Sequence, residues 1–331
     1  MSHIYKDIYL YFDEGPHKYT DSLGNEYTSV TTFIHNYVPK FDSKYWARKK
    51  AKEQGVSEKE ILRQWAKITD EACSRGNRKH EGIETAIKDV SKFKDAIKYL
   101  KQTDGRCITV ADIPDMLPTP LDVDKFIDAT ENKYPEIYRV FKHYTDKGYT
   151  IYSEIGVFDP NFLISGTIDI LCYRPSDFVI LDWKTNRQGL QFENGYFKKD
   201  KTIIPNQLTD EWVYKGEKML PPLGHLEDCN GSHYSLQLSL YAVLTENILN
   251  IPCVGLGLCH IASPFILNSY GQPLRDKDGY HVDPNGKDVA KWHRINYLKK
   301  ECNAILKDRL MFIQSQTPNT KQLNLFEDGT A

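Results

Sequence analysis

The chain lacks the features that mark membrane-spanning, secreted or zinc-binding proteins. Over its 331 residues no apolar run is long enough to span a bilayer, and the start M-S-H-I-Y-K-D-I-Y has no signal-peptide core. The seven cysteines are scattered and form no C-x-x-C pair, which argues against a zinc ribbon and against a disulfide framework. We therefore expect a cytoplasmic protein.

A strong excess of one charge is also lacking. The 43 basic and 45 acidic residues leave a formal net charge of −2, so the overall composition does not mark a nucleic-acid-binding protein. The basic residues nevertheless gather locally, in residues 44–52, in residues 198–201, and in a group formed by Arg75, Arg78 and Lys79. Such a group is either a solvated surface or a region that attracts a phosphate backbone.

Hydrophobic periodicity predicts an α/β (α+β) fold in which helices flank a central mixed β-sheet. The expected elements are short strands to about residue 30, helices to about residue 100, a helix over 123–148, strands over 150–158, 162–173 and 178–185, a helix over 234–249, a strand over 253–262, a hairpin over 266–286 and a helix over 287–313. We expect the intervening residues 187–233 to be a polar insertion, because they show no clear period.

These elements predict a single domain over residues 1–313, followed by a disordered tail over 314–331. The N-terminal strands and helices would cover 1–148, the core with its insertion 149–262, and the hairpin and last helix 263–313. We find no internal repeat that would indicate a solenoid.

Three charged residues lie in the predicted β-hairpin in the middle of the chain. Asp169 ends G-T-I-D in its first strand, and Asp182 and Lys184 lie in V-I-L-D-W-K in its second. Because side chains alternate along a strand, Asp182 and Lys184 project from one face, which Asp169 reaches from the neighbouring strand. Two carboxylates and the Trp183 backbone carbonyl would suit Mg²⁺ or Mn²⁺. The alternative is a surface hairpin with a salt bridge.

The hairpin resembles the active site of the PD-(D/E)xK nuclease superfamily. Asp169 stands at the place of the first acid, and Asp182-Trp183-Lys184 stands at the place of the D/E-x-K triplet. The resemblance implies a restriction-endonuclease-like core that binds one or two Mg²⁺ or Mn²⁺ ions through Asp169, Asp182 and the Trp183 carbonyl. It also implies that Lys184 is catalytic.

Two helical motifs extend the resemblance to the RecB-like branch of that superfamily. Gln237 and Tyr241 form its Q-x-x-x-Y, and Gly76, His80 and Glu84 form its G-x-x-x-H-x-x-x-E. The resemblance implies that His80 is a metal ligand and that Gln237 and Tyr241 position DNA at the catalytic site. The alternatives are a structural histidine and a tyrosine that packs beside a solvated glutamine. Gly76 would let its helix approach another element closely.

The N-terminal sequence resembles the start of phage-type exonucleases and of the mitochondrial genome maintenance exonuclease group. There an S-V-T, here Ser29 to Thr31, opens the first helix, and Ser29 is also a plausible N-cap. The resemblance implies that Ser29 and Thr31 contact DNA, as would Arg75, Arg78 and Lys79, and that Glu154 is a further active-site acid. The cysteine spacing does not fit the iron–sulfur cluster that some RecB-like nucleases carry.

The predicted tail contains a second kind of motif. Residues 322–326, Q-L-N-L-F, place three large apolar side chains in a polar segment. They resemble the peptide by which bacterial replication proteins dock on the sliding clamp. The resemblance implies that Leu323, Leu325 and Phe326 fill a pocket on the clamp while Gln322 forms hydrogen bonds. The alternative is that the segment folds back onto its own domain.

Together these motifs predict a metal-dependent DNA exonuclease of phage or bacterial replication, recombination or repair. The insertion and the N-terminal helices would form a channel for single-stranded DNA, with Tyr196, Phe197 and Trp212 available for stacking. Two alternatives remain open: a structure- or site-specific endonuclease that uses the same site, and a non-catalytic, clamp-bound DNA-binding adaptor.

Overall fold

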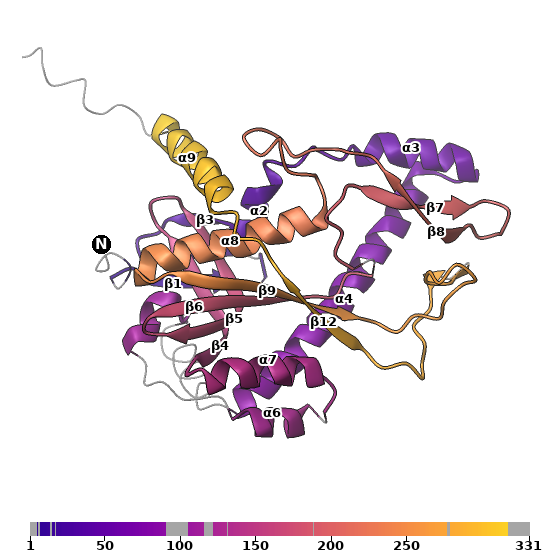
Figure 1. Ribbon diagram of the computed structural model, residues 1–331. Helices are drawn as coiled ribbons and strands as arrows, with labels where there is room; N and C mark the ends of the chain where they lie inside the picture. Colours follow the sequence, from indigo (N-terminus) through magenta and orange to yellow (C-terminus); the bar gives the residue numbers. More distant parts are fainter. Residues whose placement is uncertain are drawn as a thin grey trace, which may run out of the picture.

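The computed structural model in Figure 1 describes residues 5, 7–13, 15–16, 18–90, 105–115, 122–130, 132–187, 189–276 and 279–316. Their arrangement is a mixed α/β fold in which helices flank a central sheet of parallel and antiparallel strands. The expected fold class is therefore confirmed at this level. Among the described helices, none has an apolar stretch that could cross a membrane.

The central sheet has eight described strands. Their bounds are β1 Leu10–Asp13, β2 Lys18–Asp21, β3 Glu26–Ser29, β4 Thr150–Asp159, β5 Ile164–Arg174, β6 Asp177–Lys184, β9 Cys253–Ala262 and β12 Val289–Arg294. The order is β1-β2-β3-β5-β6-β9-β12, and β4 pairs with the other edge of β5. The pairs β3–β5 and β6–β9 are parallel, and the remaining pairs are antiparallel.

Strand β5 has an unpaired stretch on one edge. Its residues 164–165 pair with β3, and its residues 170–174 pair with β6 on the same edge. The ladder with β6 ends at the pair Ile170–Leu181, so residues 166–169 lie in a fork between β3 and β6. Asp169 is the last residue of that fork.

Each face of the sheet carries its own hydrophobic core. One core joins α2 (Val30–His35), α8 (Asn230–Leu249) and α9 (Lys299–Gln316) to the face that bears Phe178 and Ile180. The other joins α4 (Glu58–Val90), α6 (Val123–Ala129) and α7 (Pro135–Asp146) to the face that bears Val179 and Leu181. Figure 1 shows α8 on one side of the strands and α6 and α7 on the other.

Two short hairpins and helix α3 lie beyond the ends of the central strands. The hairpin of β7 (Gly195–Asp200) and β8 (Gln207–Tyr214) lies near α3 (Ser43–Gln54) in Figure 1, and the second hairpin consists of β10 (Arg275–Asp276) and β11 (Gly279–Tyr280). The expected polar insertion at 187–233 therefore contains a paired hairpin, whose strands are too exposed to show a clear apolar period.

Three other expected boundaries were wrong. Residues 289–294 form β12 rather than the start of a helix, because they pair with the edge of β9; the last helix begins at Lys299. That helix continues to Gln316, so residues 314–316 do not belong to a disordered tail. The expected helix over 123–148 is two helices, because Asn132 adopts a φ of 54° and Pro135 starts a new helix. A 3-10 helix (Val110–Asp115) precedes them in the chain.

Candidate active site

Asp169 and Asp182 occupy the point where β5 and β6 separate. They are the next residues along each strand after the last ladder pair, Ile170–Leu181. The backbone N–H of Trp183 donates to Asp169 Oδ2 at 3.1 Å, which replaces a ladder hydrogen bond by one from main chain to carboxylate. The fork thus brings the two acids of the predicted hairpin together.

Asp182 is an acid in a site that disfavours its negative charge. Its side chain is 3% exposed, and its Oδ2 forms an ion pair with Lys184 Nζ at 2.5 Å. Burial and the charge of Asp169 raise the pKa of Asp182 to about 7, although Lys184 opposes the rise. For Lys184, the two carboxylates outweigh burial and raise its pKa. Lys184 is therefore a cation between two acids that compete for it.

Helix α8 covers this pair with Tyr241 and Gln237. A Cβ at Gly166, in the fork of β5, would lie 2.6 Å from Tyr241 Cε1, so only glycine lets the ring approach the strand this closely. Gln237 Nε2 donates to the Tyr241 hydroxyl at 3.4 Å. Burial raises the pKa of Tyr241, and the charges of Asp182 and Asp169 add to the rise, so the phenol stays protonated. The predicted helical pair therefore lies at the acids.

Glu154 lies beside Asp169 in the strand register but has an unusual backbone. It falls between the ladder pairs Ser153–Ile170 and Ile155–Ile168, directly opposite Asp169. Its φ is 54°, in the left-handed region that non-glycine residues rarely adopt. Burial raises the pKa of Tyr19, and the negative charge of Glu154 adds to that rise. Glu154 is therefore a neighbour of the acid pair, and its side chain also lies near Tyr19.

The structure places His80 on the long helix α4, as predicted, but its side chain lies outside the described residues, as do those of Arg75 and Glu84. The helix itself approaches the site closely. A Cβ at Gly76 would lie 3.1 Å from Thr185 Oγ1, directly after Lys184. Gly76 thus provides the close approach that the sequence predicted.

The predicted DNA-binding residues divide into exposed and internally bonded ones. Arg78 is exposed, whereas Lys79 donates to Asp288 and to Ser263 at 2.9 Å each and is largely buried. Lys79 therefore ties α4 to the chain before β12. Ser29 caps α2 by accepting from the Thr32 N–H at 3.1 Å, and its hydroxyl also contacts that of Thr31 at 3.1 Å. The predicted N-cap is confirmed.

A cleft of about 930 Å³ opens at the C-terminal end of β6. Its basic and aromatic lining residues come from α3, α4, α8, β6, β7, the second hairpin and the segments after β6 and β9: Lys50, Lys67, Lys184, Arg187, Lys199, Arg275, Trp65, Trp183, Tyr234, Phe265 and Tyr280. Glu71 is the one acidic residue in the described lining. Lys184 belongs to both sites, and its Nζ lies 4.9 Å from the centre of the Tyr234 ring.

Positive charge accumulates at the rim of this cleft. The pKa of Lys199 is lowered by partial desolvation and by the charges of Arg275, Lys50 and Arg187. Lys50, Lys199 and Arg275 come from parts of the chain far apart in sequence, which is why sequence patterns did not reveal the group. The predicted stacking residues lie elsewhere: Phe197 and Trp212 pack edge to face at 5.0 Å within the β7–β8 hairpin, and neither they nor Tyr196 line the cleft.

The predicted metal site and the predicted clamp-binding peptide remain to be considered. Within the described residues, no group of three or more His, Cys, Asp and Glu side chains is arranged to hold a metal ion. The clamp-binding peptide at 322–326 lies outside the described residues and stays a prediction. No protein-family model, curated protein or solved structure matches the chain significantly.

Proposed function

We propose that the chain is a metal-dependent deoxyribonuclease of the PD-(D/E)xK superfamily, in its RecB-like branch, and that it acts as an exonuclease. The observation that carries the proposal is the position of Lys184. Its ammonium contacts Asp182 of the acid pair, and the same residue lines a basic, aromatic cleft. A phosphate in the cleft would meet Lys184 directly, and the acid pair lies behind that lysine.

The acid pair fits a hard divalent cation. Asp182 Oδ2 is a buried oxygen whose neighbour is the Lys184 ammonium, and burial and the charge of Asp169 raise the pKa of Asp182 more than Lys184 lowers it. Asp169 and Asp182 would hold Mg²⁺ or Mn²⁺, with the Trp183 carbonyl and His80 as further ligands. Such an ion polarises a phosphoryl oxygen and lowers the pKa of bound water.

The chain's own groups would supply charge and position. The raised pKa of Lys184 keeps its ammonium protonated, so it stabilises negative charge that develops on the phosphate, or orients the attacking water. Tyr241 remains a neutral phenol, held by Gln237 and by its contact with Gly166. It can donate a hydrogen bond to a phosphate oxygen without adding charge to the site.

The cleft fits a flexible polyanion with exposed bases. Cations on its rim attract phosphates, and the rings of residues such as Trp65 and Tyr280 offer faces for unstacked bases. This combination favours single-stranded DNA, or a duplex end that has opened, as the substrate. The Arg187 guanidinium carbon lies 3.7 Å from the centre of the Tyr280 ring, so this part of the cleft is both aromatic and positively charged.

The test is cleavage by the purified chain of end-labelled single-stranded, double-stranded and closed circular DNA, each with Mg²⁺, Mn²⁺ or EDTA. We expect metal-dependent release of short products from linear single strands and no cleavage in EDTA. Cleavage of the closed circle would replace the exonuclease with an endonuclease at the same site. Binding to all three substrates without cleavage under any condition would leave the non-catalytic adaptor.

A further inference from the structure

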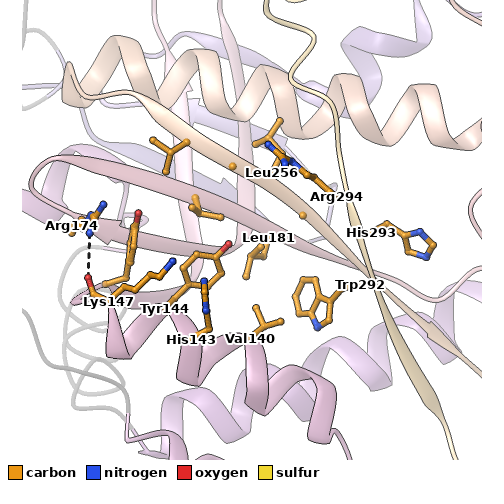
Figure 2. Close-up of a pocket in the computed structure, with 15 residues that line it drawn as sticks. Val140, His143, Tyr144, Lys147, Arg174, Leu181, Leu256, Trp292, His293 and Arg294 are labelled. Carbon is orange, nitrogen blue, oxygen red and sulfur yellow. Dashed lines mark hydrogen bonds between the residues drawn. The ribbon is translucent and has the colours of Figure 1, made fainter.

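A second hollow, of about 560 Å³, lies between α7 and the strands β6, β9 and β12 (Figure 2). Its floor includes Val179 and Leu181 of β6, which belong to the core under α7. Asp182 alternates with them and so projects from the other face. The hollow is therefore separate from the candidate active site.

The floor of this hollow is low at Gly255 of β9, whereas Leu181 fills the space at Gly257, where a Cβ would lie 2.8 Å from Leu181 Cδ2. Gly255 pairs with Val179, and Gly257 pairs with Leu181, on the face where Cys259 and Ile261 are buried further along the strand. Neither glycine has a positive φ. A Cβ at Gly255 would meet Val179 Cγ2 at 3.5 Å, an ordinary contact. Neither backbone conformation nor packing requires glycine at 255, and the residue lines the hollow without a side chain to fill it.

Aromatic rings form the walls of the hollow. Tyr144 and Tyr149 pack edge to face with their centres 5.4 Å apart. Trp292 is held in place because its Nε1 donates to the Glu136 carbonyl at 3.2 Å. Figure 2 shows the Tyr144 and Trp292 side chains reaching the hollow from α7 and β12 respectively. These fixed rings offer an apolar surface to a flat ligand.

The lining is basic and contains no carboxylate among its described residues. Arg174 is already occupied, because Asp177 binds its Nε and Nη2 and the Lys147 carbonyl accepts from its Nη1 at 3.3 Å. Lys147 and Arg294 have no ion pair within the described part of the chain. Burial raises the pKa of Tyr144, and the positive charge of Arg294, which lines the same hollow, opposes that rise.

We propose that this hollow binds one nucleotide unit. The base would lie over the Gly255 floor between the aromatic walls, and the phosphate would pair with Lys147 and Arg294. The volume falls in the range of about 300–1,000 Å³ that is usual for small-ligand sites. The unit is either a free nucleoside monophosphate or one residue of a strand that crosses this face. The proposal does not depend on cleavage or on a metal ion.

The test is calorimetry of the full chain in EDTA with deoxyadenosine monophosphate, deoxyadenosine, inorganic phosphate and a short oligothymidylate. We expect the nucleotide to bind more tightly than the nucleoside or phosphate alone. Gly255→Leu, which fills the hollow, should abolish this binding. Arg294→Glu should weaken it about tenfold through loss of a charge-assisted contact. Lys291→Glu, on the same strand but outside the lining, is the matched control and should leave it unchanged.

Comparison of the probes identifies the source of the nucleotide. If only oligothymidylate binds, and Arg294→Glu but not Lys291→Glu weakens that binding, the ligand is one residue of a DNA strand. If the monophosphate binds and responds to the two substitutions in the same way, the ligand is a free nucleotide. Equal affinity for inorganic phosphate and nucleotide would reduce the site to an anion contact and overturn the proposal. Binding that survives both Gly255→Leu and Arg294→Glu, or no binding of any probe, would overturn it too. Arg294 is exposed, so Arg294→Glu should fold normally and tests the proposal even if Gly255→Leu unfolds.

Discussion

Tyr241 of α8 packs directly on Gly166 of β5 at the candidate active site, and a Cβ at 166 would lie 2.6 Å from Tyr241 Cε1. The contact fixes the height of α8 above β5 and with it the distance of the phenol from the acids. Gly166 has no positive φ, so its requirement for glycine is one of space.

Gly166→Ala should therefore shift Tyr241 and reduce cleavage by about ten- to a hundredfold, with a loss of stability of about 1–3 kcal/mol from overpacking. Cleavage rates and melting curves check both effects. Gly255→Ala is the control for activity and stability, since its new Cβ makes only a 3.5 Å contact. If Gly166→Ala leaves the cleavage rate unchanged, Tyr241 does not position the substrate.

Asp182→Asn should stabilise the metal-free chain at neutral and higher pH. The folded-state pKa of about 7 lies above the ordinary value of 3.8, so the folded chain holds the proton more tightly. Between these two pH values the unfolded chain loses its proton first, and wild-type stability falls as the pH rises. The advantage of Asn should grow over this window to on the order of 4 kcal/mol and then level off. A series of melting curves in EDTA, from about pH 4 to about pH 8, measures this difference. A constant difference across the series would contradict the account.

Lys199→Ala should weaken binding of single-stranded DNA and lower the slope of log affinity against log salt by about 0.7, because one phosphate contact is lost. Lys198→Ala is the matched control, since Lys198 is the preceding residue of β7, is paired with Glu211 at 3.0 Å and does not line the cleft. Fluorescence anisotropy at several salt concentrations, in EDTA, separates the two variants. Equal slopes for both would remove the cleft as the path of the strand.

Lys79→Met should lower stability rather than DNA affinity. Its ammonium is paired with Asp288 at 2.9 Å, and both side chains are nearly buried, so the substitution leaves an unpaired carboxylate. We expect a loss of about 1–3 kcal/mol in unfolding free energy and an unchanged dissociation constant for DNA in the folded fraction. Arg78 is the exposed neighbour of Lys79, so Arg78→Ala should weaken DNA binding and leave the unfolding free energy unchanged. A Lys79→Met chain that melts normally but binds DNA poorly would restore Lys79 to the DNA-binding residues.

The parts of the site that follow from local patterns could be predicted from the sequence. Alternation along β5 and β6 placed Asp169 and Asp182 together, and the four-residue spacing placed Gln237 and Tyr241 on one helical face. Ser29 could be assigned as a cap because its hydroxyl serves the N–H groups of its own helix.

The parts of the fold and of the site that depend on tertiary packing could not be predicted from the sequence. Trp292 and Ile295 fit a helical spacing, yet the open edge of β9 makes the first of them part of a strand. The left-handed backbone of Glu154 has no local signal such as glycine or asparagine. The positive rim of the cleft escapes any sequence window, because Lys50, Lys199 and Arg275 are brought together only by the fold.

The most direct test of the central claim is the rate of cleavage of a labelled single-stranded oligonucleotide by wild type, Asp182→Asn and Asp177→Asn in Mn²⁺. Asp177 is the matched control because it is a largely buried carboxylate on the same strand, held by Arg174 far from the fork. The account predicts cleavage by wild type and by folded Asp177→Asn, and a loss of at least about a thousandfold in Asp182→Asn, as expected when transition-state stabilisation of about 4 kcal/mol disappears. Wild-type rates in a folded Asp182→Asn chain would contradict it.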